Sequence, residues 1–157
     1  MLARILFAVF VALLGLDLGA GLYETRVLVP RWESSLEAGA APTDPVLMLS
    51  RDAGMRWWRG VTPAVGLFAL LALVTNLMTP GTGRVWRVGA AGLELAVVVT
   101  TMTYFAPNII RLLDPGRTLP GVEAAAQLRT WSAFNWVRVV ATGGAWLASL
   151  RALSRLG

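Results

Sequence analysis

The chain has 157 residues, of which 56% are hydrophobic and only 15% are charged, with a mean hydropathy of +0.63. A soluble domain usually carries about 25% charged residues, so this chain is too apolar to present a fully hydrated surface. It contains no Cys, no His and no Lys, and all 14 basic residues are Arg.

These absences limit the possible chemistry. Without Cys or His there is no disulfide, thiolate nucleophile, imidazole base or Cys/His metal site. We expect no metal and no cofactor, so any reaction must use carboxylates, Arg, Tyr, Trp, Asn, Ser or Thr. The net charge of +5 does not indicate a nucleic-acid partner, because the Arg residues are scattered beside apolar runs.

Four apolar runs predict four membrane spans, at about residues 2–23, 61–79, 88–107 and 132–150. Each is close to the roughly 20 residues with which a helix crosses the hydrocarbon core. Backbone groups in lipid must be satisfied internally, which favours helices. We therefore expect an all-α integral membrane four-helix bundle, a single domain over residues 1–157. We interpret the first run as a retained span rather than a cleaved signal peptide, because Asp17 interrupts its apolar sequence.

The connections between these runs differ in length. Pro80 begins a tight Pro-Gly turn between the second and third runs, whereas about 37 residues separate the first two. Within that long first extramembrane loop, Asp44 followed by Pro45 is typical of a helix start. Residues 46–59 then predict a short interfacial helix that ends in Trp57-Trp58 and is anchored by these indoles. Trp57 and the earlier Trp32 are expected to be interface anchors rather than ligand contacts. Residues 121–130 predict a further helix leading into the fourth run.

The distribution of Arg suggests an orientation. The side of the membrane that holds both termini and the short turn carries Arg without any acid: Arg4, Arg84, Arg87, Arg151 and Arg155. By the positive-inside rule we expect a multi-pass protein of the cell membrane with both termini in the cytoplasm. The opposite side has more Arg in total, interleaved with acids in the long connections, and simple counting would favour the reverse.

Polar residues within the runs fall on one face of each helix, given an advance of about 100° per residue. Asp17 and Glu24 share a face of the first run, and Trp58 precedes the second. In the third run Glu94, Thr101 and Asn108 superpose, with Tyr104 and Arg111 on the same side. Trp131, Asn135 and Arg138 form the stripe of the fourth run.

These polar residues also lie at a similar depth, because all of them except Glu94 are in the half of the bundle next to the long connections. Ionisable groups inside a membrane cost roughly 2.5–3.5 kcal/mol each on insertion scales and are functional candidates by default. The cluster therefore predicts a polar pocket at that pole. The structural alternative is that Arg138 pairs with an acid only to hold the helices in register.

Three short elements resemble those of the anthrone oxygenase-like family of small four-helix membrane proteins. They are Glu24 followed by Pro30, Pro107-Asn108 at the end of the third run, and Trp131 with Asn135 and Arg138 at the start of the fourth. The resemblance covers most of the chain and implies the four-helix architecture. Some members of the family are similar to cofactor-free oxygenases of polycyclic phenols, although the His that a family member uses at the pocket is absent here.

Two functions from different classes fit these features. In the first, a lipophilic phenol or enol enters from the bilayer and Glu24 or Asp17 removes a proton. Arg138 and the other polar groups then stabilise the enolate, and Tyr104 relays a proton. The anion reacts with oxygen or rearranges. The ligand contacts expected are Asn108, Arg111, Asn135, Trp131, Trp58, Thr101 and Glu94.

In the second, a small transporter exchanges protons for a lipophilic ligand at Asp17 or Glu94. A third interpretation is an assembly subunit whose outer loops meet a partner. The expected partners are the lipid bilayer and a lipophilic small molecule, and a homo-oligomer is left open.

Overall fold

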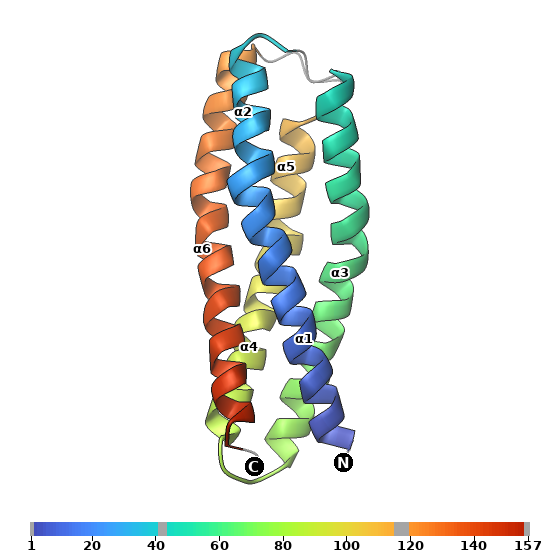
Figure 1. Ribbon diagram of the computed structural model, residues 1–157, viewed down its shortest axis with the longest axis vertical. Helices are drawn as coiled ribbons and strands as arrows, with labels where there is room; N and C mark the ends of the chain where they lie inside the picture. The colour runs from blue at the N-terminus through green and yellow to red at the C-terminus, as the bar shows by residue number, and fades with distance from the viewer. Residues whose placement is uncertain (1, 41–43, 115–119, 156–157) are drawn as a thin grey trace.

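The computed structural model describes residues 2–40, 44–114 and 120–155, and these form four long helical rods (Figure 1). The first rod runs through α1 (Leu2–Tyr23), the π-helical segment η1 (Glu24–Leu28) and α2 (Val29–Glu37). The second rod is α3 (Pro45–Met78), whose 34 residues extend for about 50 Å at 1.5 Å per residue.

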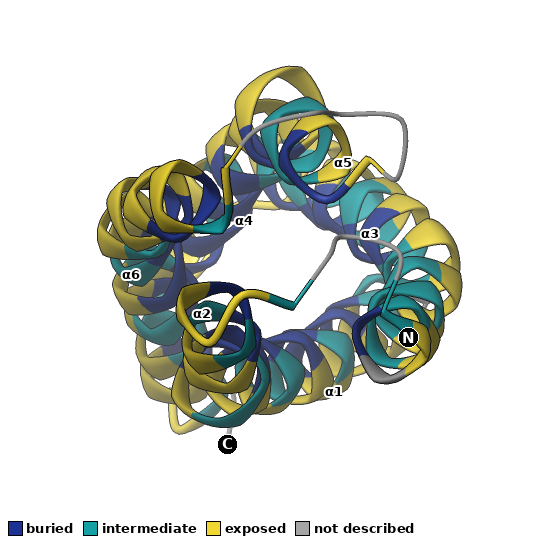
Figure 2. Cartoon of the chain, turned by 90° about the horizontal axis from the view of Figure 1, so that it is seen from above, coloured by how far each residue is buried: buried dark blue, intermediate teal, exposed yellow. Residues whose placement is uncertain are grey.

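The third rod is interrupted in the same way as the first. It runs through α4 (Arg84–Thr100), the π-helical segment η2 (Thr101–Phe105) and α5 (Ala106–Leu112). The fourth rod is α6 (Gly121–Leu153). The rods alternate in direction, α1 packs on α3 and α6, and α4 packs on the same two helices. Seen from above, buried positions face the centre and exposed positions face outwards (Figure 2).

The predicted long first loop is wrong. Helical structure continues from α1 through α2 to Glu37, and α3 begins at Pro45 with the backbone N–H of Leu47 donating to Asp44 Oδ1 at 3.3 Å. The helix start at Asp44-Pro45 is thereby confirmed. Residues 46–59 are helical, but they form the upper part of α3 rather than a separate interfacial helix, because Gly60 alone does not end a helix.

The two predicted Trp anchors behave differently. Trp57 is exposed, as an interface anchor would be. Trp32 is buried, and its indole N–H donates to the Ser50 hydroxyl at 2.8 Å, so it joins α2 to α3 inside the bundle. Trp32 was predicted wrongly because it was assigned to a loop, whereas it lies on the inner face of α2.

The short turn and the fourth helix follow the sequence prediction. Gly81 and Gly83 have φ angles of +144° and +77°, which favour glycine. The Arg84 guanidinium donates to the carbonyls of Asn76 and Leu77, groups at the C-terminal end of α3 that lack partners within the helix. The helix predicted at residues 121–130 forms the beginning of α6.

The interior contains two apolar cores separated by a polar layer. The lower core includes Phe7, Phe10, Leu14, Val65 and Ala145. The upper core includes Val29, Trp32, Leu36, Phe105, Leu112, Leu128 and Trp131. Buried polar side chains lie between them: Asp17, Glu24, Thr25, Thr62, Glu94, Thr101, Asn135, Arg138 and Thr142.

Three helical segments are long and apolar enough to cross a membrane: Ala3–Glu37, Leu47–Met78 and Arg84–Leu112. The described part of α6 is not among them, since Asn135, Arg138 and several small residues lower its hydropathy. The chain is therefore an all-helical bundle with three candidate spans, and the fourth span stays a prediction.

Candidate functional site

A buried ion pair forms the centre of the polar layer. Arg138 on α6 places Nη2 at 3.2 Å from Glu24 Oε2, and the two side chains are only 6% and 10% exposed. The other carboxylate oxygen accepts the indole N–H of Trp58 at 3.0 Å. Arg138 also lies over the Trp58 ring, 4.9 Å from its centroid, which is a cation–π distance. Three rods thus meet at one carboxylate.

Asn135 extends this network to a residue that the sequence analysis missed. Its amide oxygen accepts a hydrogen bond from Arg138 Nε at 2.7 Å, and its amide nitrogen donates to the Thr25 hydroxyl at 3.1 Å. Thr25 in turn donates to the carbonyl of Gly21 at 2.7 Å. A Cβ at Gly21 would lie 3.6 Å from Arg138 Nη2, so the glycine brings α1 close to the guanidinium.

The two π-helical segments have a common sequence cause. Each begins six residues before a proline, Glu24 before Pro30 and Thr101 before Pro107. Proline lacks an N–H and its ring clashes with the carbonyl four residues earlier. In both segments the residue before the proline, Val29 or Ala106, donates its N–H to the carbonyl five residues back. The wider turn accommodates the proline without ending the rod, and such turns are frequent at functional sites.

The extra residue in each wide turn rotates everything beyond it by about 100°. In the first rod this buries two consecutive polar residues, Glu24 and Thr25. In the third rod it turns Phe105 and Leu112 towards the interior.

The wide turn therefore moves three of the predicted site residues away from the interior, where a uniform helical period had placed them. Tyr104 is exposed and packs edge-on against Phe134 on the outer surface. Asn108 is half-buried, and its amide donates to the carbonyl of Tyr104 at 2.8 Å. Arg111 is exposed on α5. None of the three lines the cavities described next.

Above the ion pair, α3 and the η2–α5 segment leave a cleft between them. Its inner part is a cavity of about 270 Å³ that reaches Glu24, Asn135 and Arg138. Its walls are mainly apolar, from Met55, Trp58, Pro63, Met102, Phe105, Ile109, Ile110 and Trp131. Thr101 also lines it, so the predicted contacts Trp58, Thr101, Trp131 and Asn135 all lie at this cavity.

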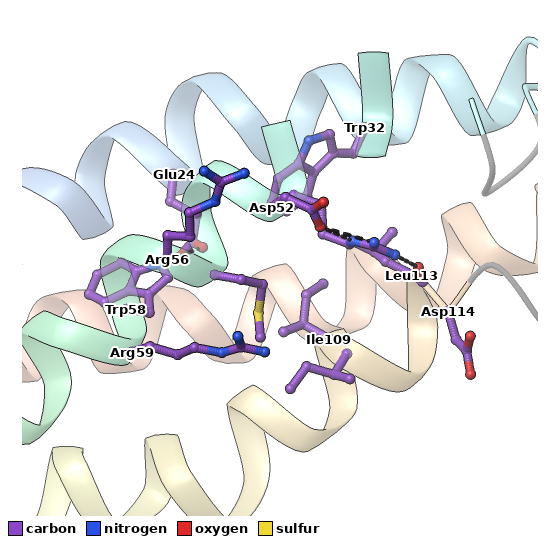
Figure 3. Close-up of a pocket in the computed structure, with 13 residues that line it drawn as sticks. Glu24, Trp32, Asp52, Arg56, Trp58, Arg59, Ile109, Leu113 and Asp114 are labelled. Atoms are coloured by element: carbon purple, nitrogen blue, oxygen red, sulfur yellow. Dashed lines mark hydrogen bonds and ion pairs between the residues drawn. The ribbon is translucent and has the colours of Figure 1, made fainter. Parts of the chain in front are cut away.

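The outer part of the cleft is a cavity of about 490 Å³ that shares Glu24, Trp58 and Arg59 with the inner one. Arg51 is held there by Asp52 at 3.0 Å and by the carbonyl of Leu113 at 2.7 Å. Figure 3 shows Arg59 reaching from α3 towards Ile109 on α5. Arg56 and Arg59 line this mouth and, within the described part of the chain, take part in no ion pair.

Asp17 and Glu94 lie below the ion pair and outside both cavities. Glu94 is fully buried, and neither carboxylate oxygen has a hydrogen-bond partner among the described residues. Its polar neighbours are Asp17, Arg138 and Thr142, whose hydroxyl likewise makes no hydrogen bond within the described chain. The structure therefore separates the predicted acids into Glu24 at the cleft and a deeper pair.

Comparison with protein-family models, with curated proteins and with solved structures finds no match to this chain. The elements that resemble the anthrone oxygenase-like family separate in the structure. Glu24, Trp131, Asn135 and Arg138 gather at the inner cavity, while Asn108 turns away from it.

Proposed function

We propose that this chain is a membrane protein whose cleft binds a lipophilic molecule with an acidic O–H or C–H group, and that it catalyses proton transfer on that molecule. Glu24 is the proposed base and Arg138 the group that stabilises the resulting oxyanion. The observation that carries the proposal is a buried Glu24–Arg138 pair at a cavity whose walls are mainly apolar.

The walls of the cleft support a lipophilic ligand. Ligand sites are typically apolar pockets with a few convergent polar groups that fix orientation. Here aromatic, Met and Ile side chains form most of the inner cavity. Its polar lining consists of Glu24, Arg59, Thr62, Thr101, Asn135 and Arg138. A volume of about 270 Å³ suits a molecule of two or three fused rings, the size class of the phenols that the sequence resemblance implies.

The charges at the cleft support a ligand that becomes anionic. The mouth is lined by three arginines, Arg51, Arg56 and Arg59, and by three acids, Glu24, Asp52 and Asp114, so its charges balance. Arg56 and Arg59 are the groups there that could contact an anionic ligand favourably. At the inner end, Trp58 and Asn135 hold the carboxylate and the guanidinium in fixed positions. Donors fixed in advance stabilise a developing oxyanion without having to reorganise.

The proposed step transfers one proton. Glu24 takes a proton from the carbon next to a ligand carbonyl, the C–H electron pair forms the enolate, and the oxyanion accepts hydrogen bonds from Arg138. The proton then returns from Glu24 to the enolate oxygen, or to a different carbon of a conjugated enolate, which isomerises the ligand. An electron-rich phenolate formed in the same way would be the species that reacts with molecular oxygen.

The exposed surface supports a position in the bilayer. Outward-facing residues of the lower half are large and apolar, as at Leu16, Leu70, Val99 and Leu147. Charged side chains replace them higher up, so the cleft lies near the upper boundary of the apolar belt. We propose four spans with the upper helices projecting out of the membrane and both termini in the cytoplasm.

The topology can be tested with single cysteines, because the chain has none of its own. Ser34→Cys in α2 and Ser154→Cys beyond α6 are both at exposed positions. A membrane-impermeant maleimide should label the first in intact cells and the second only after permeabilisation. The reverse pattern would invert the orientation, and labelling of both in intact cells would place the two residues on the same face of the membrane, which four spans do not allow.

Proton abstraction can be measured without knowing the natural substrate. Purified protein in nanodiscs is incubated in D₂O with 2-tetralone, a lipophilic ketone with exchangeable C–H groups, and deuterium uptake is followed by mass spectrometry. We expect exchange above the buffer rate, abolished by Glu24→Gln and reduced by Arg138→Met. Glu33→Gln, which removes an acid on the outside of α2, serves as the matched control and should exchange as the parent does.

A second assay follows binding separately. 1-Naphthol should bind more tightly than 1-methoxynaphthalene, and the absorbance of bound naphtholate should depend on Glu24. Equal affinity for the two compounds together with no exchange of 2-tetralone would overturn the proposal.

Proton-coupled transport is the second candidate, favoured by one observation. Glu94 is a fully buried carboxyl group without a hydrogen-bond partner among the described residues, next to Asp17. Carboxyl groups inside membrane bundles mark proton pathways in pumps and transporters. In proteoliposomes a pH-driven flux of a lipophilic ligand that Asp17→Asn or Glu94→Gln abolishes would favour transport. Absence of flux with intact 1-naphthol binding would favour the enzyme.

A further inference from the structure

At the opposite pole from the cleft lies another cavity, of about 330 Å³. Among the residues that the structure describes, three arginines and no acidic side chain line it: Arg4, Arg87 and Arg155. It lies where the start of α1, the end of α3 and the Pro80–Thr82 turn meet. Hydroxyl-bearing Thr79 and Thr82 also line it.

Arg87 is the central observation. Its residue surface is only 4% exposed, yet within the described part of the chain it forms no ion pair. Buried arginines are ordinarily paired with an anion, because a desolvated charge without a counter-charge is costly. The partners that Arg87 has here are neutral. Nε donates to the amide oxygen of Asn76, and Nη1 donates to the carbonyl of Thr82 at 2.8 Å.

These neutral partners hold the guanidinium in place. The amide nitrogen of Asn76 donates to the carbonyl of Ala72 at 2.6 Å, so the amide oxygen of Asn76 faces Arg87. The Thr82 hydroxyl donates to the carbonyl of Arg155 at 3.2 Å and so ties the turn to the end of α6. Gly83 has a φ of +77°, which favours glycine, and a Cβ there would lie in ordinary contact with Arg87 Nη1, at 3.6 Å.

From this arrangement we infer that the cavity is a binding site for a phosphate group. A fixed guanidinium at the inner end and two exposed arginines at the rim supply the donors that phosphate oxygens accept. The inference is independent of the proposed chemistry at the cleft. Basic pockets between helices at a membrane face bind anionic lipid headgroups, and a free phosphate compound presents the same group.

The test uses the full chain in nanodiscs and measures bound molecules by native mass spectrometry. One set of nanodiscs contains phosphatidylcholine alone, and another contains phosphatidylglycerol in phosphatidylcholine. Inorganic phosphate is titrated separately into the first set. Retention of phosphatidylglycerol without phosphate binding identifies a lipid headgroup, whereas saturable phosphate binding identifies a free anion. Either result supports the site, and binding of neither overturns it.

Variants that each remove one positive charge distinguish a specific binding site from non-specific electrostatic attraction. Arg4→Gln and Arg155→Gln remove exposed rim arginines without disturbing the interior. Each should weaken binding by about tenfold, the value of one hydrogen bond to a charged group. Arg151→Gln removes the same charge from an exposed position of α6 that does not line the cavity. An equal loss in Arg151→Gln would show non-specific attraction and refute the site.

Discussion

Removing Arg138 should be among the most damaging single changes in the bundle. Arg138→Met deletes the ion pair with Glu24, the hydrogen bond to Asn135 and the contact with the Trp58 ring in one step. The Glu24 carboxylate would keep the hydrogen bond from the Trp58 indole but lose its counter-charge, and at 10% side-chain exposure water cannot replace the guanidinium. Breaking a buried pair in this way costs roughly 3–5 kcal/mol.

Replacing both partners should cost much less than replacing one. In the double variant Glu24→Leu with Arg138→Met no buried charge is left alone, and such replacements of buried pairs are often neutral or stabilising. Reversible denaturation in mixed micelles gives the unfolding free energies for a double-mutant cycle. We also expect Arg138→Met to lower the Tm by about 6 °C or more, from the usual 2–4 °C per kcal/mol for a chain of this size.

A surface ion pair supplies the control for this cycle. Arg129 contacts Glu33 and Glu37 on the outside of the bundle with its own side chain 47% exposed. Arg129→Met should therefore shift the Tm far less than Arg138→Met. If Arg138→Met and Arg129→Met have similar small effects, or if the two changes at the buried pair are simply additive, then the pair does not act as a desolvated unit.

Two further predictions concern the helices themselves. Pro107→Ala restores a backbone N–H and should allow η2 to return to the α-helical period. Maleimide labelling of Tyr104→Cys should then fall, and labelling of Phe105→Cys should rise. Unchanged labelling would show that proline does not maintain the wide turn. Gly121→Ala places a Cβ inside contact distance of a backbone carbonyl of α2 and should lower the free energy of unfolding by about 1–3 kcal/mol. Gly89→Ala has nothing near its Cβ and should raise the free energy of unfolding by up to about 1 kcal/mol. Equal effects of the two variants on the Tm would contradict the close approach of α2 to α6.

Features that depend on neighbouring residues could be predicted from the sequence. The start of α3 at Pro45 depends on Asp44 beside it, and the turn after Met78 depends on Pro80, Gly81 and Gly83. The clustering of Glu24, Trp58, Asn135 and Arg138 was also predicted, because helical phase and depth suffice to bring them together. Hydropathy placed the apolar runs correctly within the helices.

The length of the rods could not be obtained in this way. Hydropathy marks where a helix is apolar, not where it ends, so the amphipathic residues of α2 and the upper part of α3 were read as loop. Those residues bury a second core of their own, which includes Trp32, Leu36 and Leu128. Apolar residues at Val29, Trp32 and Leu36, spaced three and four residues apart, were the signal that a helix continues there.

The wide turns explain the remaining errors and connect the site to the upper core. Two adjacent buried polar residues, Glu24 and Thr25, do not fit one face of a uniform α-helix. The extra residue in η1 accommodates both, and the same rotation turns Val29 and Trp32 inwards above them. Because one turn serves both purposes, the packing of the upper bundle and the position of the Glu24 carboxylate are coupled. A substitution that returns η1 to a regular α-helix must therefore disturb the ion pair and the cleft together, even when the substituted residue belongs to neither.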